Sequence, residues 1–173
     1  MITIISGKYK GQKLVDVNSP QVRPTLARVK KSLLQILEPF EGKTVLDLFS
    51  GIGNLGIEAI SRGAASVTFV ERDIKVFQLL QKNINKICPE DNATLYKMDV
   101  RQFFLKNKRK YDIILADPPY GLFEFDFIKE SITDILNNKG IFCMEMELTK
   151  LMHEDIRIKK YGKTQVVFWR AVS

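Results

Sequence analysis

The chain has 173 residues, which is ample for one domain with a buried core and short for two. Its hydrophobic content of 45% and charged content of 27% are ordinary for a soluble globular protein, and no apolar run approaches membrane-spanning length. The net charge of +7 and the pI near 9.4 favour a polyanionic partner. The first residues lack the basic and apolar regions of a signal peptide. We therefore expect a single cytoplasmic domain over residues 1–173, with Cys88 and Cys143 as reduced thiols.

The first 40 residues are expected to form an N-terminal extension. Residues 1–17 predict two short strands about a turn at Gly7–Gly11. A helix should begin at Pro24 or Thr25 and run through Leu37, because the apolar residues there recur at helical spacing. Pro39 should end it. Residues 41–173 then form the core of the domain.

From Thr44 onward, strand patterns alternate with helical patterns. This alternation predicts an α/β fold whose mostly parallel sheet is covered by helices on both faces. A turn is expected at residues 137–140, and a terminal hairpin is expected from Ile156–Tyr161 and Gln165–Trp169 about Gly162. The expected strands cover 44–49, 66–71, 93–97, 112–116 and 140–146, and the expected helices cover 54–62, 74–87, 100–106 and 125–136.

A glycine-rich turn follows the first of these strands. Residues 47–56 have the sequence DLFSGIGNLG, in which Gly51 and Gly53 allow backbone geometry and a close approach that other residues forbid. Glu71 ends the next strand, where an acid commonly accepts hydrogen bonds from the ribose hydroxyls of a nucleotide. The spacing also fits the dinucleotide fingerprint, so alone it leaves open a nicotinamide cofactor or another adenosine cofactor.

Two further acids bear on that choice. Asp47 lies just before the glycine turn, where a carboxylate would repel a pyrophosphate and favour an ammonium or sulfonium group. S-adenosylmethionine has both cations and no phosphate. Asp99 follows the strand at 93–97 and is placed to accept a hydrogen bond from an adenine amine. Together these residues favour S-adenosylmethionine as the cofactor.

The most specific motif is Asp117-Pro118-Pro119-Tyr120, at the end of an apolar strand. The prolines fix the backbone and remove two N–H donors, which predicts a rigid turn with a carboxylate and carbonyl oxygens directed at one point. Such a turn suits a flat base with an exocyclic amine, because the acceptors can hold the amine while Tyr120 stacks on the ring. Ligands bind at the carboxyl ends of parallel strands, so the four strand-end acids should meet at one edge: Asp47, Glu71, Asp99 and Asp117.

Basic residues are concentrated near the N-terminus. Seven of them occur through residue 31, against a single acid, Asp16. We expect this segment to contact nucleic acid. A second basic cluster at 106–110 is interpreted as a solvated surface. No metal-ligand spacing is present, so no metal is expected. Because no apolar run is long enough to span a membrane, no membrane is expected as a partner either. The expected RNA contacts are Lys8, Lys10, Lys13, Arg23 and Arg28.

The order of these motifs resembles the class I, Rossmann-like S-adenosylmethionine-dependent methyltransferases. More narrowly, it resembles the RsmD family of small-subunit (16S) ribosomal RNA (guanine-N2) methyltransferases. The resemblance covers almost the whole chain, including IISGKYKGQKL at residues 4–14, RPT at 23–25, SRGA at 61–64 and KYGKT at 160–164. It implies a seven-stranded, mostly parallel sheet with a C-terminal antiparallel hairpin and a small N-terminal hairpin and helix.

The resemblance also implies roles for the residues named above. Asp47, Gly51 and Gly53 would line the methionine part of the cofactor, Glu71 would hold the ribose and Asp99 the adenine. The target base would be held by Asp117, Pro118 and Tyr120, with Pro119 in the same catalytic turn. The substrate would be ribosomal RNA or an assembling small ribosomal subunit.

Three other functions stay open. An adenine-N6 methyltransferase acting on DNA or RNA could use the same Pro-Pro turn, although such enzymes usually have an added target-recognition region for which this chain has no room. A nicotinamide oxidoreductase would need a hydride-transfer site, and the only Tyr-x-x-x-Lys pattern, from Tyr9 to Lys13, lies in the N-terminal segment. A non-catalytic RNA-binding module would not need an acid at all four strand ends.

Overall fold

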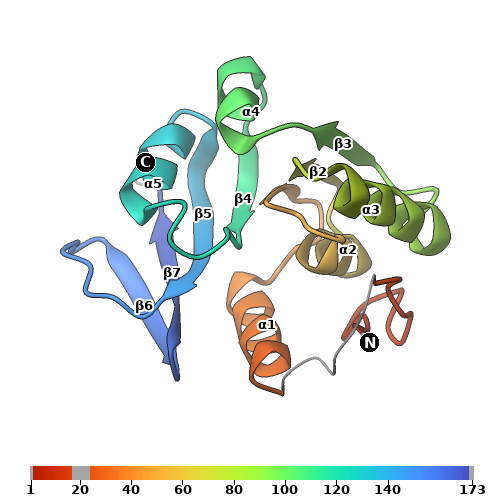
Figure 1. The fold of residues 1–173 in the computed structure, drawn as a ribbon, viewed down its shortest axis with the longest axis horizontal. Helices are drawn as coiled ribbons and strands as arrows, with labels where there is room; N and C mark the ends of the chain where they lie inside the picture. The colour runs from red at the N-terminus through yellow and green to blue at the C-terminus, as the bar shows by residue number, and fades with distance from the viewer. Residues whose placement is uncertain (1, 17–23, 172–173) are drawn as a thin grey trace.

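The computed structural model describes residues 2–16 and 24–171, and side chains from residue 27 on in the second range. These residues form a seven-stranded sheet in the order β3-β2-β1-β4-β5-β7-β6. Strands β1 to β5 are parallel, and β7 pairs antiparallel with both β5 and β6 (Figure 1). The predicted fold is therefore confirmed. The strands are β1 (Thr44–Leu48), β2 (Ser66–Glu71), β3 (Ala93–Lys97), β4 (Tyr111–Ala116), β5 (Leu136–Glu147), β6 (Ile156–Tyr161) and β7 (Thr164–Arg170).

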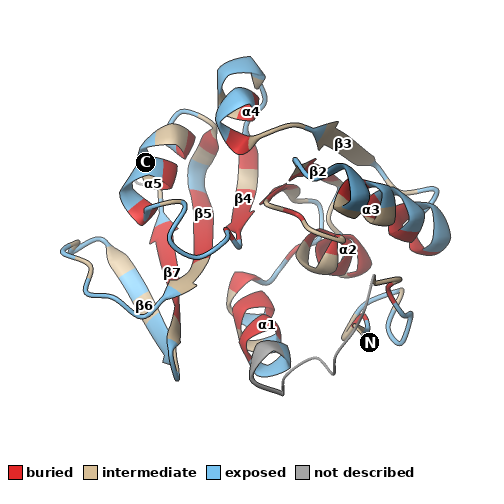
Figure 2. Cartoon of the chain, in the orientation of Figure 1, coloured by how far each residue is buried: buried red, intermediate tan, exposed pale blue. Residues whose placement is uncertain are grey.

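Helices cover both faces of this sheet. α1 (Pro24–Leu37), α2 (Asn54–Ser61) and α3 (Ile74–Ile87) pack on one face, and α4 (Val100–Lys106) and α5 (Phe125–Ile132) pack on the other. Successive side chains of a strand point to opposite faces, so each strand contributes to both cores. In β4, for example, Ile113 and Leu115 join the α1–α3 side, whereas Ile114 and Ala116 join the α4–α5 side. Figure 2 shows the resulting burial along β4, β5 and β7.

The N-terminal segment is less regular than the predicted hairpin. It has one isolated bridge, Thr3 with Lys13, in place of two strands. Backbone hydrogen bonds from Leu14 to Ile2 and from Ile4 to Gln12 nevertheless fold it back on itself. Its buried Ile4 and Leu14 belong to the core on the α1–α3 side.

Two buried polar side chains attach this segment to the helices. Glu58 of α2 is fully buried and accepts hydrogen bonds from the backbone amides of Ile5 and Ser6, both at 2.9 Å. Asn83 of α3 is also fully buried. Its Oδ1 accepts from the Val15 amide at 2.7 Å, and its Nδ2 donates to the carbonyls of Val15 and Ile52, both at 3.0 Å. Asn83 therefore connects the end of the N-terminal segment to the glycine turn.

Two predictions about the last third of the sheet were wrong. The helix expected over 125–136 ends at Ile132. The turn expected at 137–140 lies inside β5, where the pairing moves from Tyr111–Leu136 to Ile113–Ile141. Lys139 has a φ of 62° there, so the turn-forming residues make a bulge that lets β5 continue rather than a separate turn. Asn137 also donates to Asp112 at 2.9 Å, which fixes the bulge to β4.

Candidate active site

Two carboxyl groups hold the glycine turn to the sheet. Asp47 of β1 is 1% exposed, and its Oδ2 accepts a hydrogen bond of 2.9 Å from the Gly56 amide. Glu71 ends β2 and accepts one of 2.9 Å from the Gly51 amide. Gly51 and Gly53 have φ values of 56° and 93°, in the region that favours glycine. The Gly51 and Gly56 amides are thus bound by acids from two neighbouring strands.

The surroundings of Asp47 favour its protonated form. Burial raises its pKa to about 8, although the Gly56 amide acts in the opposite direction, and the nearby carboxyls of Asp117 and Glu71 raise the pKa further. Gly56 leaves no room for a side chain here, since an added Cβ would lie 2.2 Å from the Phe69 ring. Asp47 is therefore packed within the turn.

A cavity of about 120 Å³ lies at the carboxyl ends of the central strands. Glu71, Asp99 and Asp117 line it, so the structure brings together three of the four predicted acids. Asp47 is not among the described residues that line this cavity. Asp99 also caps α4 by accepting a hydrogen bond of 2.9 Å from the Arg101 amide. The other lining residues are Phe49, Val70, Arg72, Met98, Val100, Pro119 and Phe123.

Aromatic rings that the sequence did not single out form part of this wall. Phe49 follows β1 with a φ of 57°, and its ring lies edge-on to that of Phe123, with centroids 4.7 Å apart. The Arg101 guanidinium lies over Phe123, 4.3 Å from its centroid. Phe49 and Phe123 are 74 residues apart in the sequence, and although Phe49 lies within the glycine-rich motif at residues 47–56, the motif assigns no role to its ring. Only the fold brings them together.

The turn formed by residues 117–120 separates this cavity from a larger groove of about 500 Å³. Pro119 and Phe123 line both spaces. Tyr120 is 50% exposed and lines the groove. Although Asp117 is accessible, the surrounding protein partly desolvates its carboxyl and raises its pKa to about 6. Across from the turn, the groove is lined by Met144, Met146 and residues 147–151.

The predicted RNA contacts fall into three groups. Lys10, Lys13 and Arg28 are exposed. Lys8 is exposed as well, but it forms an ion pair with Asp91. Arg23 lies outside the described residues. Lys30, which belongs to the same basic stretch of sequence, is buried and paired with Glu58 at 3.1 Å, so it supports the core rather than the surface.

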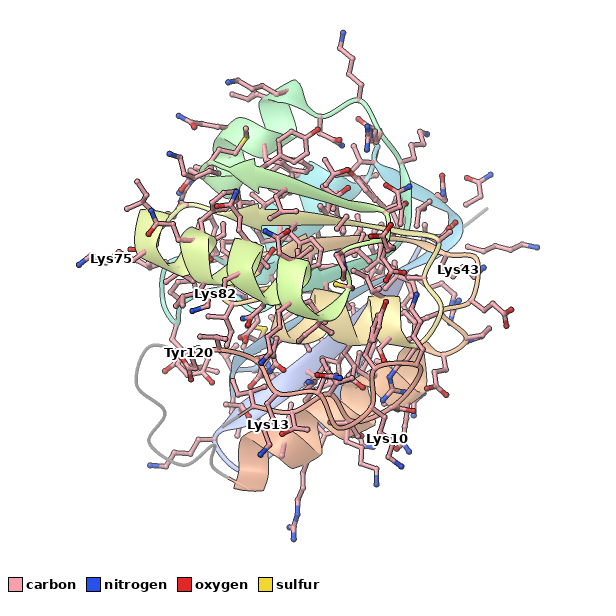
Figure 3. The ribbon with its side chains drawn as sticks, turned by 90° about the vertical axis from the view of Figure 1, so that its right-hand side faces the viewer. Lys10, Lys13, Lys43, Lys75, Lys82 and Tyr120 are labelled. Atoms are coloured by element: carbon pink, nitrogen blue, oxygen red, sulfur yellow. The ribbon has the colours of Figure 1, made fainter. Side chains whose placement is uncertain are left out.

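Helix α3 adds two basic residues that the sequence reasoning missed. Lys75 and Lys82 are exposed on this helix, seven residues apart, and so project from nearly the same side of it. In Figure 3, Lys75, Lys82 and Tyr120 all lie toward the left of the view, and Lys13 lies nearer its centre. The seven-residue spacing of Lys75 and Lys82 could be read from the sequence as two basic residues on one side of a helix. Nothing in the sequence placed that helix relative to the Pro-Pro turn.

The comparisons with known proteins agree with this geometry. The family model described as "Conserved hypothetical protein 95" matches residues 2–170. A ribosomal RNA small subunit methyltransferase D from Haemophilus influenzae is 36% identical over 180 residues, which cover 98% of this chain and 92% of that protein. The chain belongs to the ribosomal RNA small subunit methyltransferase D family.

Two further comparisons extend this assignment. A second family member, from Buchnera aphidicola, is 39% identical over 144 residues, covering 81% of this chain and 72% of that protein. The solved structure of yhhF from Escherichia coli is 29% identical, with a TM-score of 0.85 and 99% of each chain covered. The likeness therefore includes the N-terminal segment as well as the sheet.

No group of three or more His, Cys, Asp or Glu side chains is arranged to hold a metal ion within residues 2–16 and 24–171. No helix in the same ranges is long and apolar enough to cross a membrane.

Proposed function

We propose that this chain uses S-adenosylmethionine to methylate the exocyclic N2 amine of a guanine in small-subunit (16S) ribosomal RNA. One observation supports it most strongly: the acid-lined cavity and the groove beside Tyr120 share Pro119 as a wall. A cofactor and a base can thus approach each other across the turn that starts at Asp117. Relatives named ribosomal RNA small subunit methyltransferase D support the choice of RNA. We place this reaction in the cytoplasm, on free ribosomal RNA or an assembling subunit, within one domain.

The small cavity suits S-adenosylmethionine better than a nicotinamide dinucleotide. The amides of Gly51 and Gly56 already donate to the carboxyl groups of Glu71 and Asp47, so these donors are not free to bind a pyrophosphate. When bound, S-adenosylmethionine supplies an electrophilic methyl group on a positively charged sulfur. We assign its methionine part to Asp47, Gly51 and Gly53, its ribose to Glu71 and its adenine to Asp99.

On the substrate side, the residues of the Pro-Pro turn orient the amine. We assign hydrogen bonds from the N2 amine to the Asp117 carboxylate and the Pro118 carbonyl, and stacking on the ring to Tyr120. Holding the nucleophile in line in this way lowers the barrier by converting a chance encounter into a fixed geometry. With a pKa of about 6, Asp117 is charged at neutral pH and basic enough to accept the proton that the amine loses.

We assign RNA backbone contacts to the basic side chains around this edge. The exposed Lys10, Lys13 and Arg28, together with Lys8 and Arg23, form the predicted set. Lys75 and Lys82 extend it along α3. Their charges would hold phosphates independently of sequence and so place an unpaired base near Tyr120.

The test is transfer of labelled methyl from S-adenosylmethionine to RNA of cells that lack the protein, with the modified nucleoside identified by mass. N2-methylguanosine in 16S RNA is the expected product. N6-methyladenosine would move the function to the alternative adenine-N6 methyltransferase. No transfer together with no cofactor binding would refute the proposal.

Asp117→Ala and the exposed control Asp134→Asn test the assigned role of Asp117. We expect Asp117→Ala to lower the turnover by about 10²-fold or more, as for the loss of a positioned proton acceptor. Its affinity for S-adenosylmethionine should stay close to that of the control. Weaker cofactor binding with unchanged turnover of the bound complex would contradict this role.

A further inference from the structure

The hairpin formed by β6 and β7 lies at the carboxyl edge of the sheet, beside the groove. Its turn falls within the KYGKT motif at residues 160–164, to which the proposed function gives no role. β7 begins opposite Glu147, the last residue of β5. In the groove wall, the Leu148 amide donates a hydrogen bond of 2.9 Å to the Lys163 carbonyl in the turn. The turn of the hairpin therefore continues the wall formed by residues 147–151.

Three lysines, Lys150, Lys160 and Lys163, form a basic rim along this wall. All three are exposed, and none of them makes an ion pair in the part of the chain that the structure describes. Lys160 is opposite Gln165 in the hairpin, and the Gln165 amide donates to the Thr149 carbonyl of the groove wall at 2.9 Å. Because paired residues place their side chains on the same face, Lys160 lies on the groove side of the hairpin.

Helix α1 fixes the hairpin from its other face. The Ser32 hydroxyl accepts hydrogen bonds from Lys159 Nζ at 2.7 Å and from the Tyr161 hydroxyl at 2.6 Å. Arg28, one of the predicted RNA contacts, is exposed one turn before Ser32 and so lies on the same side of α1. The hairpin is therefore held in place next to a basic residue that was already expected to contact RNA.

The position of the rim relative to the Pro-Pro turn suits the backbone of an RNA strand. An internal nucleotide whose base reaches Tyr120 has neighbours on both sides. α3, with Lys75 and Lys82, packs on β2 and β3, whereas β6 is at the opposite edge of the sheet (Figure 1). β6 is three strands from β4, which is about 14 Å at the usual strand spacing. The rim can thus meet nucleotides that leave the site on the side away from α3.

Another reason for lysines here is protection of an edge strand. A lysine on an edge strand discourages pairing with a second chain, and β6 is such a strand. This would account for Lys160 but not for Lys150 and Lys163, which lie outside β6. Lysines without a carboxylate partner are also the ones that bind phosphates at the least cost, because no ion pair has to be broken.

We propose that the basic rim of Lys150, Lys160 and Lys163 is a second RNA-binding surface, which holds backbone phosphates on the opposite side of the target base from α3. This inference rests on the proposed function for its class of substrate, an RNA strand. The rim binds the strand and takes no part in the bond changes at the base. It gives the KYGKT motif a role in substrate binding.

The test measures the affinity for a single-stranded RNA of mixed sequence, long enough to span the edge of the sheet, at several salt concentrations. Lys160→Gln with Lys163→Gln should reduce the slope of log affinity against log salt concentration by about 1.4, at about 0.7 per phosphate contact on a single strand. Lys160→Arg with Lys163→Arg should keep the slope, because arginine keeps the charge. In methyl transfer, the glutamine variant should raise the KM for RNA and leave kcat unchanged, as for a contact made equally in the ground state and the transition state.

Lys108→Gln with Lys110→Gln is the matched control. Both lysines are exposed just before β4, at the opposite edge of the sheet, so this variant removes the same charge away from the site and should keep the wild-type slope. An unchanged slope in the rim variant, or an equal change in the control, would overturn the proposal. Self-association of the rim variant with unchanged RNA affinity would also overturn it, and would assign the lysines to protection of the edge strand. A wild type that binds this RNA but transfers no methyl group would refute the proposed function, and the comparison of slopes would still decide the role of the rim.

Discussion

Replacing Glu58 should loosen the N-terminal segment and destabilise the whole domain. Its buried carboxylate pairs with Lys30 at 3.1 Å and with Arg62 at 3.3 Å, and it accepts the amides of Ile5 and Ser6. Lys30 is itself buried, and this burial lowers its pKa against the effect of Glu58. Glu58→Ala would leave the Lys30 ammonium without a countercharge, which typically costs about 3–5 kcal/mol. That is a large part of the roughly 5–15 kcal/mol that stabilises a domain.

Urea denaturation would measure this loss, and limited proteolysis would show whether residues 2–16 become accessible. A double variant separates the effect of the buried charges of Lys30 and Glu58 from the effect of their side-chain volume. Lys30→Met with Glu58→Gln removes both charges at similar volume and should recover most of the stability that Glu58→Gln alone loses. Arg62 would keep Glu38 as a partner. A loss below about 1 kcal/mol in Glu58→Ala, or no recovery in the double variant, would refute the assigned cost of an unpaired Lys30.

Three further predictions follow from the site. Gly56→Ala should lower the free energy of unfolding, measured by urea titration, by about 1–3 kcal/mol through overpacking against Phe69. Gly162→Ala is the control in the same titration, because the space around Gly162 is open and the substitution tests backbone strain alone. The pKa of Asp47 is about 8 in the folded chain, whereas an aspartate in the unfolded chain loses its proton near about pH 4. The free energy of unfolding should therefore fall as the pH rises from about 4 to about 8. Thermal denaturation of Asp47→Asn should show a flatter dependence of stability on pH. The double variant Lys75→Gln with Lys82→Gln should weaken RNA binding by a similar factor for unrelated RNA sequences. It should also reduce the slope of log affinity against log salt concentration by about 0.7–0.9 per lost phosphate contact. An unchanged slope would show that α3 does not contact the RNA.

The order of elements could be predicted because hydrophobic periodicity is local. The strands at Ser66–Glu71 and Ala93–Lys97 and the helices at Ile74–Ile87 and Val100–Lys106 match the predicted bounds. The segment Asn137–Gly140 could not be predicted in this way, because its turn-forming residues make a bulge only when β4 is beside them. Lys30 was similarly assigned to a basic stretch, although the long-range partner Glu58 draws it into the core.

The site could be predicted where it depends on the ends of parallel strands. Glu71, Asp99 and Asp117 line one cavity because the fold places those ends together. The aromatic wall formed by Phe49 and Phe123 depends on loop packing. No spacing in the sequence expresses this contact, so it required the three-dimensional structure.

Pro119 and Phe123 line both the small cavity and the larger groove, and this shared wall matters for inhibitor design. A compound with an adenosine-like half in the smaller cavity and a flat aromatic half in the groove would need only a short linker past Pro119 and Phe123. Binding of one half would raise the effective concentration of the other, so the affinity of the joined compound should exceed that of either fragment. The rigid proline would also exclude linkers of the wrong length, which makes linker length the first variable for a chemist to scan.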